Sequence, residues 1–181
     1  MWYPATITAA ASSEPVSATE VKAQAEIDFT DDDTLITLMI AGARAFTEKY
    51  CGTRFATQTI SVKCDCFSDF AKFAEAPVQS VTSITYVDTD GVTQTLATSV
   101  YELRNDGLEV SIALKYGQVW PVTQTGSRIT VVAVVGYTTV PDDVKRAMLL
   151  YIAGGYANRE NAKDSDWTAF DSLLCNHRRN A

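Results

Sequence analysis

The side chains able to carry out chemistry are few and widely spaced in this chain of 181 residues. Catalysis by a serine or cysteine nucleophile needs a histidine base held in a fixed position, and His177 is the single histidine. It lies near the end of the sequence, in a segment that we expect to be mobile. The sequence contains no glycine-rich phosphate loop, zinc-peptidase motif or nucleophile elbow. A hydrolase built on two carboxylates stays open as an alternative, but the sequence favours a protein that is not an enzyme.

The four cysteines do not form a recognisable ligand set for a metal or a cofactor. Cys64 and Cys66 stand two apart on an expected strand, while Cys51 and Cys175 are distant in the sequence. Zinc sites use paired Cys-x-x-Cys or histidine spacings, and strain disfavours a disulfide between near neighbours on one strand. We therefore expect reduced thiols, no metal and no cofactor.

Composition and charge exclude several classes of protein. A formal net charge of −7 and a pI of about 4.6 argue against binding nucleic acid by phosphate neutralisation. The longest apolar segment, around residues 35–45, is interrupted by Thr37, Gly42 and Arg44 and is too short for a membrane span. The first fifteen residues lack the basic leader and apolar run of a signal peptide. We expect a soluble protein made in the cytoplasm.

The core is expected where a strand at residues 129–135 leads into a helix at 141–159. The strand is almost wholly apolar, which predicts that both of its faces are covered. Pro141 suits the first helical position, and Asp142 and Asp143 suit the positive end of the helix dipole. Gly154 and Gly155 inside the helix suggest close approach of another backbone. The apolar stripe comprises Val144, Met148, Tyr151, Ile152, Gly155 and Tyr156.

Two further helices are expected before this core. Residues 17–20 form a capping box that opens a helix over 18–25. The run of aspartates at 31–33 begins a second helix over 31–51, which ends at Gly52. Three adjacent carboxylates suggest a metal, but acids at a helix start are favourable in themselves and the sequence has no second ligand cluster. The buried stripe of this helix is expected to be Leu35, Met39, Ile40, Ala43, Phe46 and Tyr50.

Residues 55–136 alternate with period two and predict a β-rich insertion. Strands are expected over 57–66, after Pro77, over 92–96, 101–104 and 108–114, with a short one possible at 71–74. Gly91 supplies the positive φ of a hairpin turn at 88–91. The sequence therefore predicts an α+β fold, with helices packed on an antiparallel sheet.

Both ends of the chain are expected to be extended arms. Residues 1–16 have Trp2, Tyr3 and Ile7 as apolar anchors and no core of their own, so we assign them to contacts between subunits. The domain core, residues 17–160, is expected to end near Arg159. Residues 161–181 form a polar linker and a short amphipathic turn, which must fold back or dock on a partner; the polar linker favours a partner. The tail side chains are Trp167, Phe170, Leu173, Leu174, Arg178 and Arg179.

The order of these motifs resembles the head–tail connector (adaptor) family of long-tailed phages and gene transfer agents. The matching pieces are the helix at 17–25, the aspartate run into a helix ending at residues 50–54, the segments 77–86 and 88–91, and Trp120-Pro121. Gly136-Tyr137, Val140-Pro141 and the helix through residue 160 complete the match. The resemblance spans residues 17–160, and its specificity comes from the ordered set.

This resemblance implies a structural subunit of the virion neck that assembles into a ring of about twelve copies. The ring would sit beneath the portal protein, extend the DNA channel without binding DNA specifically, and meet a neck stopper or tail terminator protein. It would carry no catalytic residues and contact no membrane. Family members dock on the portal through the C-terminal segment, which makes the six tail side chains named above the candidates for that contact. The alternatives are a tail-completion or stopper protein and, from another class, a small hydrolase or ligand-binding domain.

Overall fold

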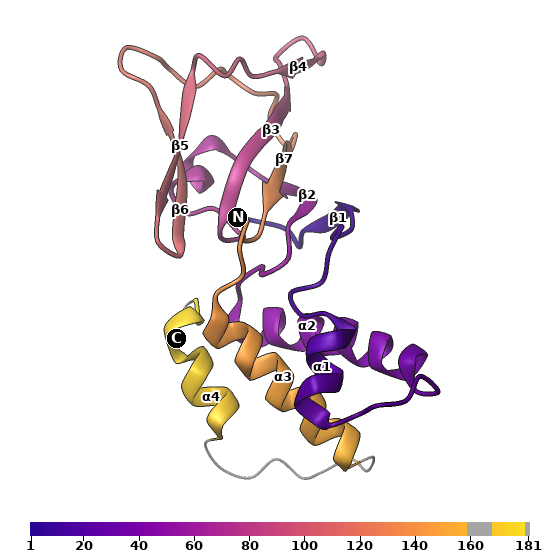
Figure 1. Ribbon diagram of the computed structural model, residues 1–181. Helices are drawn as coiled ribbons and strands as arrows, with labels where there is room; N and C mark the ends of the chain where they lie inside the picture. Colours follow the sequence, from indigo (N-terminus) through magenta and orange to yellow (C-terminus); the bar gives the residue numbers. More distant parts are fainter. Residues whose placement is uncertain (159–167, 180–181) are drawn as a thin grey trace. The chain divides into compact units, whose positions relative to one another are not determined.

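The computed structural model describes residues 1–158 and 168–179 of the chain. Its contacts define two compact units (Figure 1). A sheet unit contains Met1–Ser12 and Thr57–Thr138, and a helical unit contains Ser13–Ala56 and Thr139–Ala181. The first twelve residues, expected to be part of a separate arm, are thus grouped with the strands.

The sheet unit is built on a five-stranded antiparallel sheet with the strand order β1-β2-β7-β3-β4. A separate hairpin pairs β5 with β6, and a 3-10 helix, η1, occupies Phe67–Ala71, where a loop and a possible strand were expected. The strands are β1 Thr6–Ala9, β2 Gln58–Cys64, β3 Val78–Val87, β4 Thr93–Thr95, β5 Tyr101–Asp106, β6 Glu109–Leu114 and β7 Ile129–Val135.

Strand β7 lies at the centre of this sheet because it pairs with β2 on one side and β3 on the other. Alternate side chains, Ile129, Val131, Ala133 and Val135, are fully buried, while those between them are half-buried. We predicted that both faces of β7 are covered; one face is fully buried, and the side chains of the other face are half-buried. An antiparallel sheet needs an apolar layer on a single side.

The core of the sheet unit lies between this buried face and a layer formed by η1 and the β5–β6 hairpin. Phe67, Phe70 and Phe73 supply the aromatic part of the cluster. The Phe73 amide donates to the Val110 carbonyl at 2.7 Å, which ties the segment after η1 to β6. The Asn105 side chain donates to the Val78 carbonyl at 2.9 Å and joins the hairpin to β3.

The described part of the helical unit contains the α-helices α1 Ala18–Ala25, α2 Asp33–Cys51, α3 Asp142–Ala157 and α4 Ala169–Leu174, and a 3-10 helix, η2, over Cys175–His177. The capping box at the start of α1 is confirmed, with Ser17 and Glu20 satisfying each other's backbone amides. Gly52 ends α2 with φ +62°, as expected for a left-handed C-cap. Pro141 lies one residue before α3 rather than in its first position.

The buried face of α2 differs from the predicted stripe. Ile40 and Ala43 are buried as expected, but Leu35 is 37% exposed and Phe46 40%. The buried positions are instead Ile36, Ile40, Ala43, Thr47, Glu48 and Cys51. The predicted stripe lay about one position too early on the helix: it included Leu35 and Phe46 and omitted the buried Ile36, Thr47, Glu48 and Cys51.

The glycines of α3 do not serve the close backbone approach that we expected. A side chain at Gly154 would meet nothing within 4 Å, and one at Gly155 would meet only the flexible end of Met39, at 3.3 Å. Val144, Met148 and Ile152 form the buried stripe together with Ala147. Tyr151, assigned to that stripe from the sequence, is 44% exposed.

The α+β fold predicted from the sequence is confirmed. Two of the three aspartates in the run at 31–33 have structural partners: Lys22 forms an ion pair with Asp33, and the Tyr156 hydroxyl donates to Asp32 at 2.5 Å. Across residues 1–158 and 168–179, acidic, cysteine and histidine side chains nowhere gather in threes as a metal site requires. Within these same ranges, none of the helices has the length and apolar content for crossing a bilayer.

A substitution in β2 tests the assignment of the core. Ile60 is fully buried opposite Ala133 of β7, so Ile60→Ala should lower the free energy of unfolding by about 2–5 kcal/mol, through lost burial and the cavity left behind. Lys63→Ala, at an exposed position of the same strand, should change it by less than about 0.5 kcal/mol. Urea denaturation followed by circular dichroism measures both, and equal effects would contradict this packing.

Candidate assembly surfaces

The C-terminal segment begins with a capping box that the sequence analysis missed. The Thr168 hydroxyl accepts from the Asp171 amide, and the Asp171 carboxylate accepts from the Thr168 amide at 2.8 Å. The signal was present as Thr-x-x-Asp, the pattern that typically precedes an apolar helical turn. This box fixes the start of α4, which is otherwise too short to be stable by itself.

Asp171 also attaches α4 to α2. The Tyr50 hydroxyl donates to its carboxylate at 2.5 Å. Hydrogen bonds from the Thr168 side chain, the Tyr50 hydroxyl and the Thr168 amide lower the pKa of Asp171 to about 2. Because the folded-state pKa is depressed, this contribution to stability is complete above the ordinary aspartate pKa and is lost as the pH falls toward 2.

An aromatic cluster joins the three helices at this point. Phe170 of α4 packs against Phe46 and Tyr50 of α2 and against Tyr151 of α3, with ring centroids 5.5–5.7 Å apart. Phe46 and Tyr151 stack on each other at 5.0 Å. The Arg178 guanidinium lies 4.8 Å from the centre of the Tyr50 ring, a cation–π distance. Phe170 and Arg178 are therefore held by the chain's own helices while remaining half-exposed.

The last described residues complete the core of the helical unit. Leu174 is fully buried, so the expectation that the core ends near Arg159 was wrong. The Arg179 amide donates to the Cys51 carbonyl at 2.7 Å, satisfying one of the carbonyls that a helix end leaves without a partner. Thr53 donates its hydroxyl to the His177 carbonyl at 2.9 Å.

His177 contacts an acidic side chain of α3. Its Nε2 lies 2.8 Å from a carboxylate oxygen of Asp143, at the start of α3, and its ring edge faces Phe55. Burial alone would raise the pKa of Asp143, but the hydrogen bond and charge of His177 outweigh it and lower the pKa. The pair thus ties the C-terminal segment to α3.

Glu48 is the buried side chain that sequence reasoning missed most completely. It is buried in the last turn of α2, and one carboxylate oxygen accepts from the amides of Phe55 and Ala56 at 3.0 and 3.2 Å. The other oxygen lies 3.5 Å from Arg54 and 3.7 Å from Arg44. An acid near a helix C-terminus opposes the helix dipole, and that unfavourable position was the signal available in the sequence.

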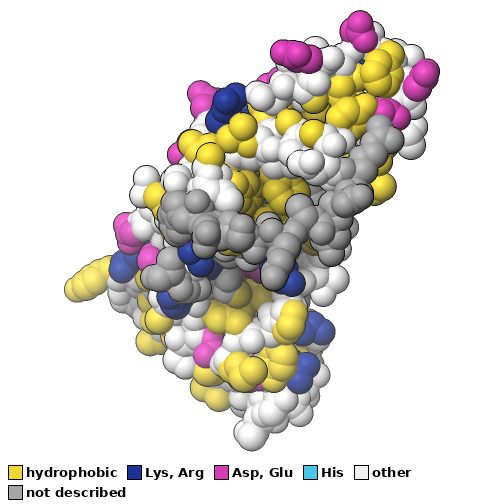
Figure 2. All heavy atoms as spheres, turned by 90° about the horizontal axis from the view of Figure 1, so that it is seen from below, with side chains coloured by type: hydrophobic (Ala, Val, Ile, Leu, Met, Phe, Trp, Pro, Cys, Tyr) yellow, Lys and Arg dark blue, Asp and Glu magenta, His cyan; other side chains and the backbone are white. Residues whose placement is uncertain are grey.

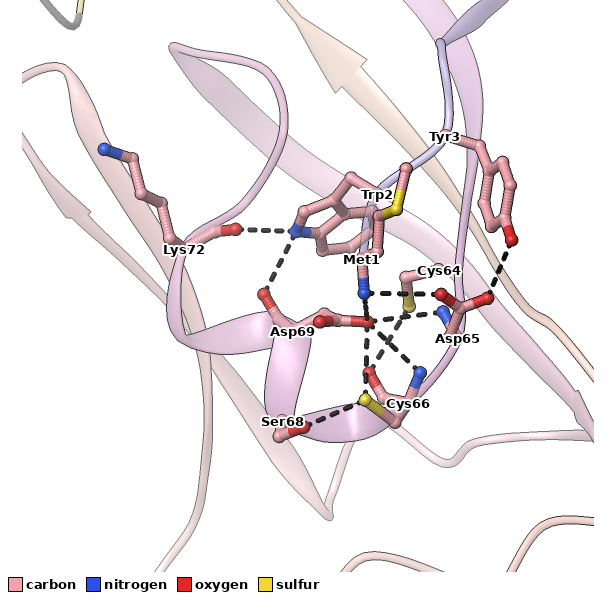
Figure 3. Close-up of polar contacts among 9 residues, drawn as sticks. All are labelled: Met1, Trp2, Tyr3, Cys64, Asp65, Cys66, Ser68, Asp69 and Lys72. Atoms are coloured by element: carbon pink, nitrogen blue, oxygen red, sulfur yellow. Dashed lines mark hydrogen bonds and ion pairs between the residues drawn. The ribbon is translucent and has the colours of Figure 1, made fainter. Parts of the chain in front are cut away.

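At the other end of the chain, Trp2 and Tyr3 are bound by the sheet unit itself (Figure 3). The Trp2 indole N–H donates to the carbonyls of Asp69 and Lys72 at 3.0 and 2.7 Å. Its ring stacks on Phe70 and meets Phe73 edge-on. The first residues therefore have a core position in their own unit, contrary to the expectation of an arm without one.

Charged groups strengthen this attachment. The Met1 amino group lies 2.5 Å from a carboxylate oxygen of Asp69, and the hydrogen bond between them lowers the pKa of Asp69 and raises that of the amino group. The Tyr3 hydroxyl donates to Asp65 at 3.0 Å, and Arg128 lies over the Tyr3 ring. Of the three predicted anchors, Ile7 alone is strongly exposed; it lies on β1, an edge strand.

The predicted docking residues at the C-terminus thus have different environments. Leu174 and Arg179 are buried, Phe170, Leu173 and Arg178 are half-exposed, and Trp167 lies outside the described residues.

The four cysteines differ in their exposure to solvent: Cys51 and Cys64 are buried, whereas Cys66 and Cys175 are exposed. Burial raises the pKa of Cys51 to about 11 and that of Cys64 to about 12.

Comparison with known proteins identifies the family. A family model described as head completion protein matches residues 14–169, most of the chain. The chain belongs to the head completion protein family. This membership confirms the resemblance to phage and gene transfer agent connector proteins drawn from residues 17–160. No match was found among curated protein sequences.

Three solved structures share the fold of this head completion family member. A chain from the virion of a native gene transfer agent particle aligns with a TM-score of 0.80 and 18% identity, covering 97% of this chain and 95% of that one. A chain from the neck of an empty particle, computed with C6 symmetry, has a TM-score of 0.79, 18% identity and the same coverage. One from a native neck with C12 symmetry has a TM-score of 0.69, 19% identity and 95% coverage of both chains.

The buried carboxylate can be tested by a matched pair of substitutions. Glu48→Ala removes the acceptor for two buried amides and one ion-pair partner of Arg44, which keeps Glu14 at 2.7 Å, so it should lower the free energy of unfolding by about 3 kcal/mol. Glu48→Gln keeps one acceptor oxygen and should cost clearly less. Denaturant unfolding of both variants measures the difference; equal costs would show that the backbone hydrogen bonds contribute little.

The Tyr50–Asp171 contact can be tested by titration. Tyr50→Phe removes one hydrogen bond to the carboxylate, so the pKa of Asp171 should rise from about 2 toward its ordinary value while the Thr168 contacts keep it below that value. NMR titration of the Asp171 carboxyl carbon measures this shift. Phe46→Leu, which leaves the hydrogen bond in place, is the control. An unchanged pKa in Tyr50→Phe would contradict the contact.

Proposed function

We propose that this chain is a structural, non-enzymatic subunit of the neck of a phage-like particle. In this role it forms a ring of copies beneath the portal, extends the DNA channel and joins the head to the tail. The proposal rests on the match to the head completion family over residues 14–169. It is supported by the likeness in fold to neck chains from gene transfer agent particles, one of them from a neck with C12 symmetry.

The charge of the chain suits a channel component. With a net charge of −7, acidic residues at the channel wall would repel phosphate and let DNA slide past without specific binding. A wall densely lined with lysine and arginine in the assembled particle would contradict this part of the proposal.

The C-terminal segment is the proposed portal contact. Phe170, Leu173 and Arg178 are half-exposed on a segment that capping, ring contacts and hydrogen bonds hold in place. A surface prepared in this way loses little conformational entropy when it binds. Leu174 and Arg179, being buried, support the segment from beneath. A stopper or tail-completion protein, which would bind the tail side, is the second candidate.

Electron microscopy of the purified protein with and without its portal separates these roles. Rings seated on the portal are expected. Binding to tail tubes alone would favour tail completion, and a monomer that turns over a substrate would overturn the structural role.

A charge reversal tests the C-terminal contact without removing buried residues. Arg178→Glu should weaken portal attachment by about tenfold or more, because it places an acid where a cation is proposed to bind. Arg104→Glu, at an exposed position in the β5–β6 hairpin, is the charge-matched control. Surface plasmon resonance on immobilised portal measures both, with circular dichroism confirming the fold. Unimpaired attachment of Arg178→Glu would count against the docking segment.

A further inference from the structure

Apolar side chains on the outward face of α2 are exposed to solvent. Leu38 is 69% exposed, and Leu35, one turn earlier on the same face, is also exposed. Gly42 follows at i+4 from Leu38 and has open space where a side chain would be. Phe29, just before the helix, is exposed as well. These three exposed apolar side chains, Phe29, Leu35 and Leu38, lie within ten residues of sequence and form what we call the helix patch; the open space at Gly42 allows another chain to approach the α2 backbone.

A second apolar surface lies on the loop between β6 and β7. Tyr116 is fully exposed, Val119 is 79% exposed and Val122 74%. These three side chains, within seven residues of sequence, form what we call the loop patch. Isolated exposed apolar residues are normal on a soluble protein, but groups of them mark interaction sites. On the face drawn in Figure 2, exposed hydrophobic side chains lie between scattered charged ones.

The loop that carries the second patch is held in one conformation. The Lys115 amide donates to the Val100 carbonyl at 3.0 Å, and the Gln124 amide donates to the Val87 carbonyl at 3.0 Å. Between these points, Trp120 stacks on Phe67 with ring centroids 4.8 Å apart. A loop fixed in this way presents its apolar side chains without the entropy cost of ordering them on binding.

The charges around the two patches are opposite in sign. Residues 116–127 contain no charged side chain and are bracketed by Lys115 and Arg128, both exposed. The helix patch is bordered in sequence by Asp28 and Asp31, also exposed. Copies that each carry −7 repel one another, so a contact between them needs uncharged centres with complementary rims. These two patches provide that combination.

We propose that the loop patch of one copy docks on the helix patch of a second copy. A contact between two different patches is head-to-tail, and a head-to-tail contact closes into a ring when its rotation allows. The inference therefore rests on the ring role proposed above and names the surfaces that build the ring. A second copy is the favoured occupant because each copy carries both surfaces.

Two single substitutions and their mixture test this contact. Leu38→Glu destroys the helix patch and Val119→Glu destroys the loop patch, each at an exposed position that should not affect folding. Either change should weaken self-association of the full chain by about 100-fold or more, by burying an unpaired acid. Thr37→Glu on α2 and Thr95→Glu on β4, both exposed, carry the same added charge and should associate like the wild type.

An equimolar mixture of the two patch variants is the decisive measurement. Leu38→Glu retains an intact loop patch and Val119→Glu an intact helix patch, so an equimolar mixture should form one-to-one dimers that grow no further. Sedimentation velocity and native mass spectrometry measure the species. A mixture that stays monomeric, single variants that associate normally, or a wild type that stays monomeric up to about 1 mM would overturn the proposal.

These outcomes are separate from those that test the neck role. If wild-type rings form on the portal and both variants still form them, the inference fails while the neck role stands. If wild-type protein associates through the two patches but never binds a portal, the neck role fails while the contact stands. Rings that form normally in Val119→Glu but fail to join a further neck protein would assign the loop patch to that protein and overturn the inference.

Discussion

Burial of the Glu48 carboxylate is the constraint on which the helical unit depends. A buried carboxylate is costly unless its oxygens accept hydrogen bonds or pair with cations, and Glu48 finds both in the chain that follows α2. Glu48 lies on the same inward face of α2 as the buried Ile36, Ile40 and Ala43. Leu35 and Leu38 lie off this face and are exposed. The buried acid and the buried apolar residues thus share one side of the helix, and the exposed leucines lie on another.

The end of α2 is also where the C-terminal segment is attached. Cys51 offers its carbonyl to Arg179, Thr53 its hydroxyl to the backbone of His177, and Tyr50 its hydroxyl to Asp171. These contacts come from positions 50, 51 and 53 at the end of α2, and the Cys51 carbonyl is one of the backbone groups that a helix end leaves in need of a partner. The segment therefore has a defined position on its own unit before any partner is present.

Local signals in the sequence were sufficient for much of the fold. The capping box at Ser17, the left-handed cap at Gly52 and the turn at Gly91 were predicted because each depends on a few neighbouring residues. The contacts of Glu48 and Trp2 were not, because their partners lie in other segments: Glu48 binds amides beyond the helix end, and Trp2 binds carbonyls near residue 70. Periodicity ranks side chains by hydrophobicity and so cannot anticipate a buried acid.

The distribution of thiols has a practical consequence. Each unit contains one sheltered cysteine, Cys64 or Cys51, whose raised pKa suppresses the reactive thiolate, and one accessible cysteine, Cys66 or Cys175. Maleimide dyes would therefore attach at one place in each unit of the unmodified sequence. Energy transfer between such dyes would report the distance between the two units without any engineered residue.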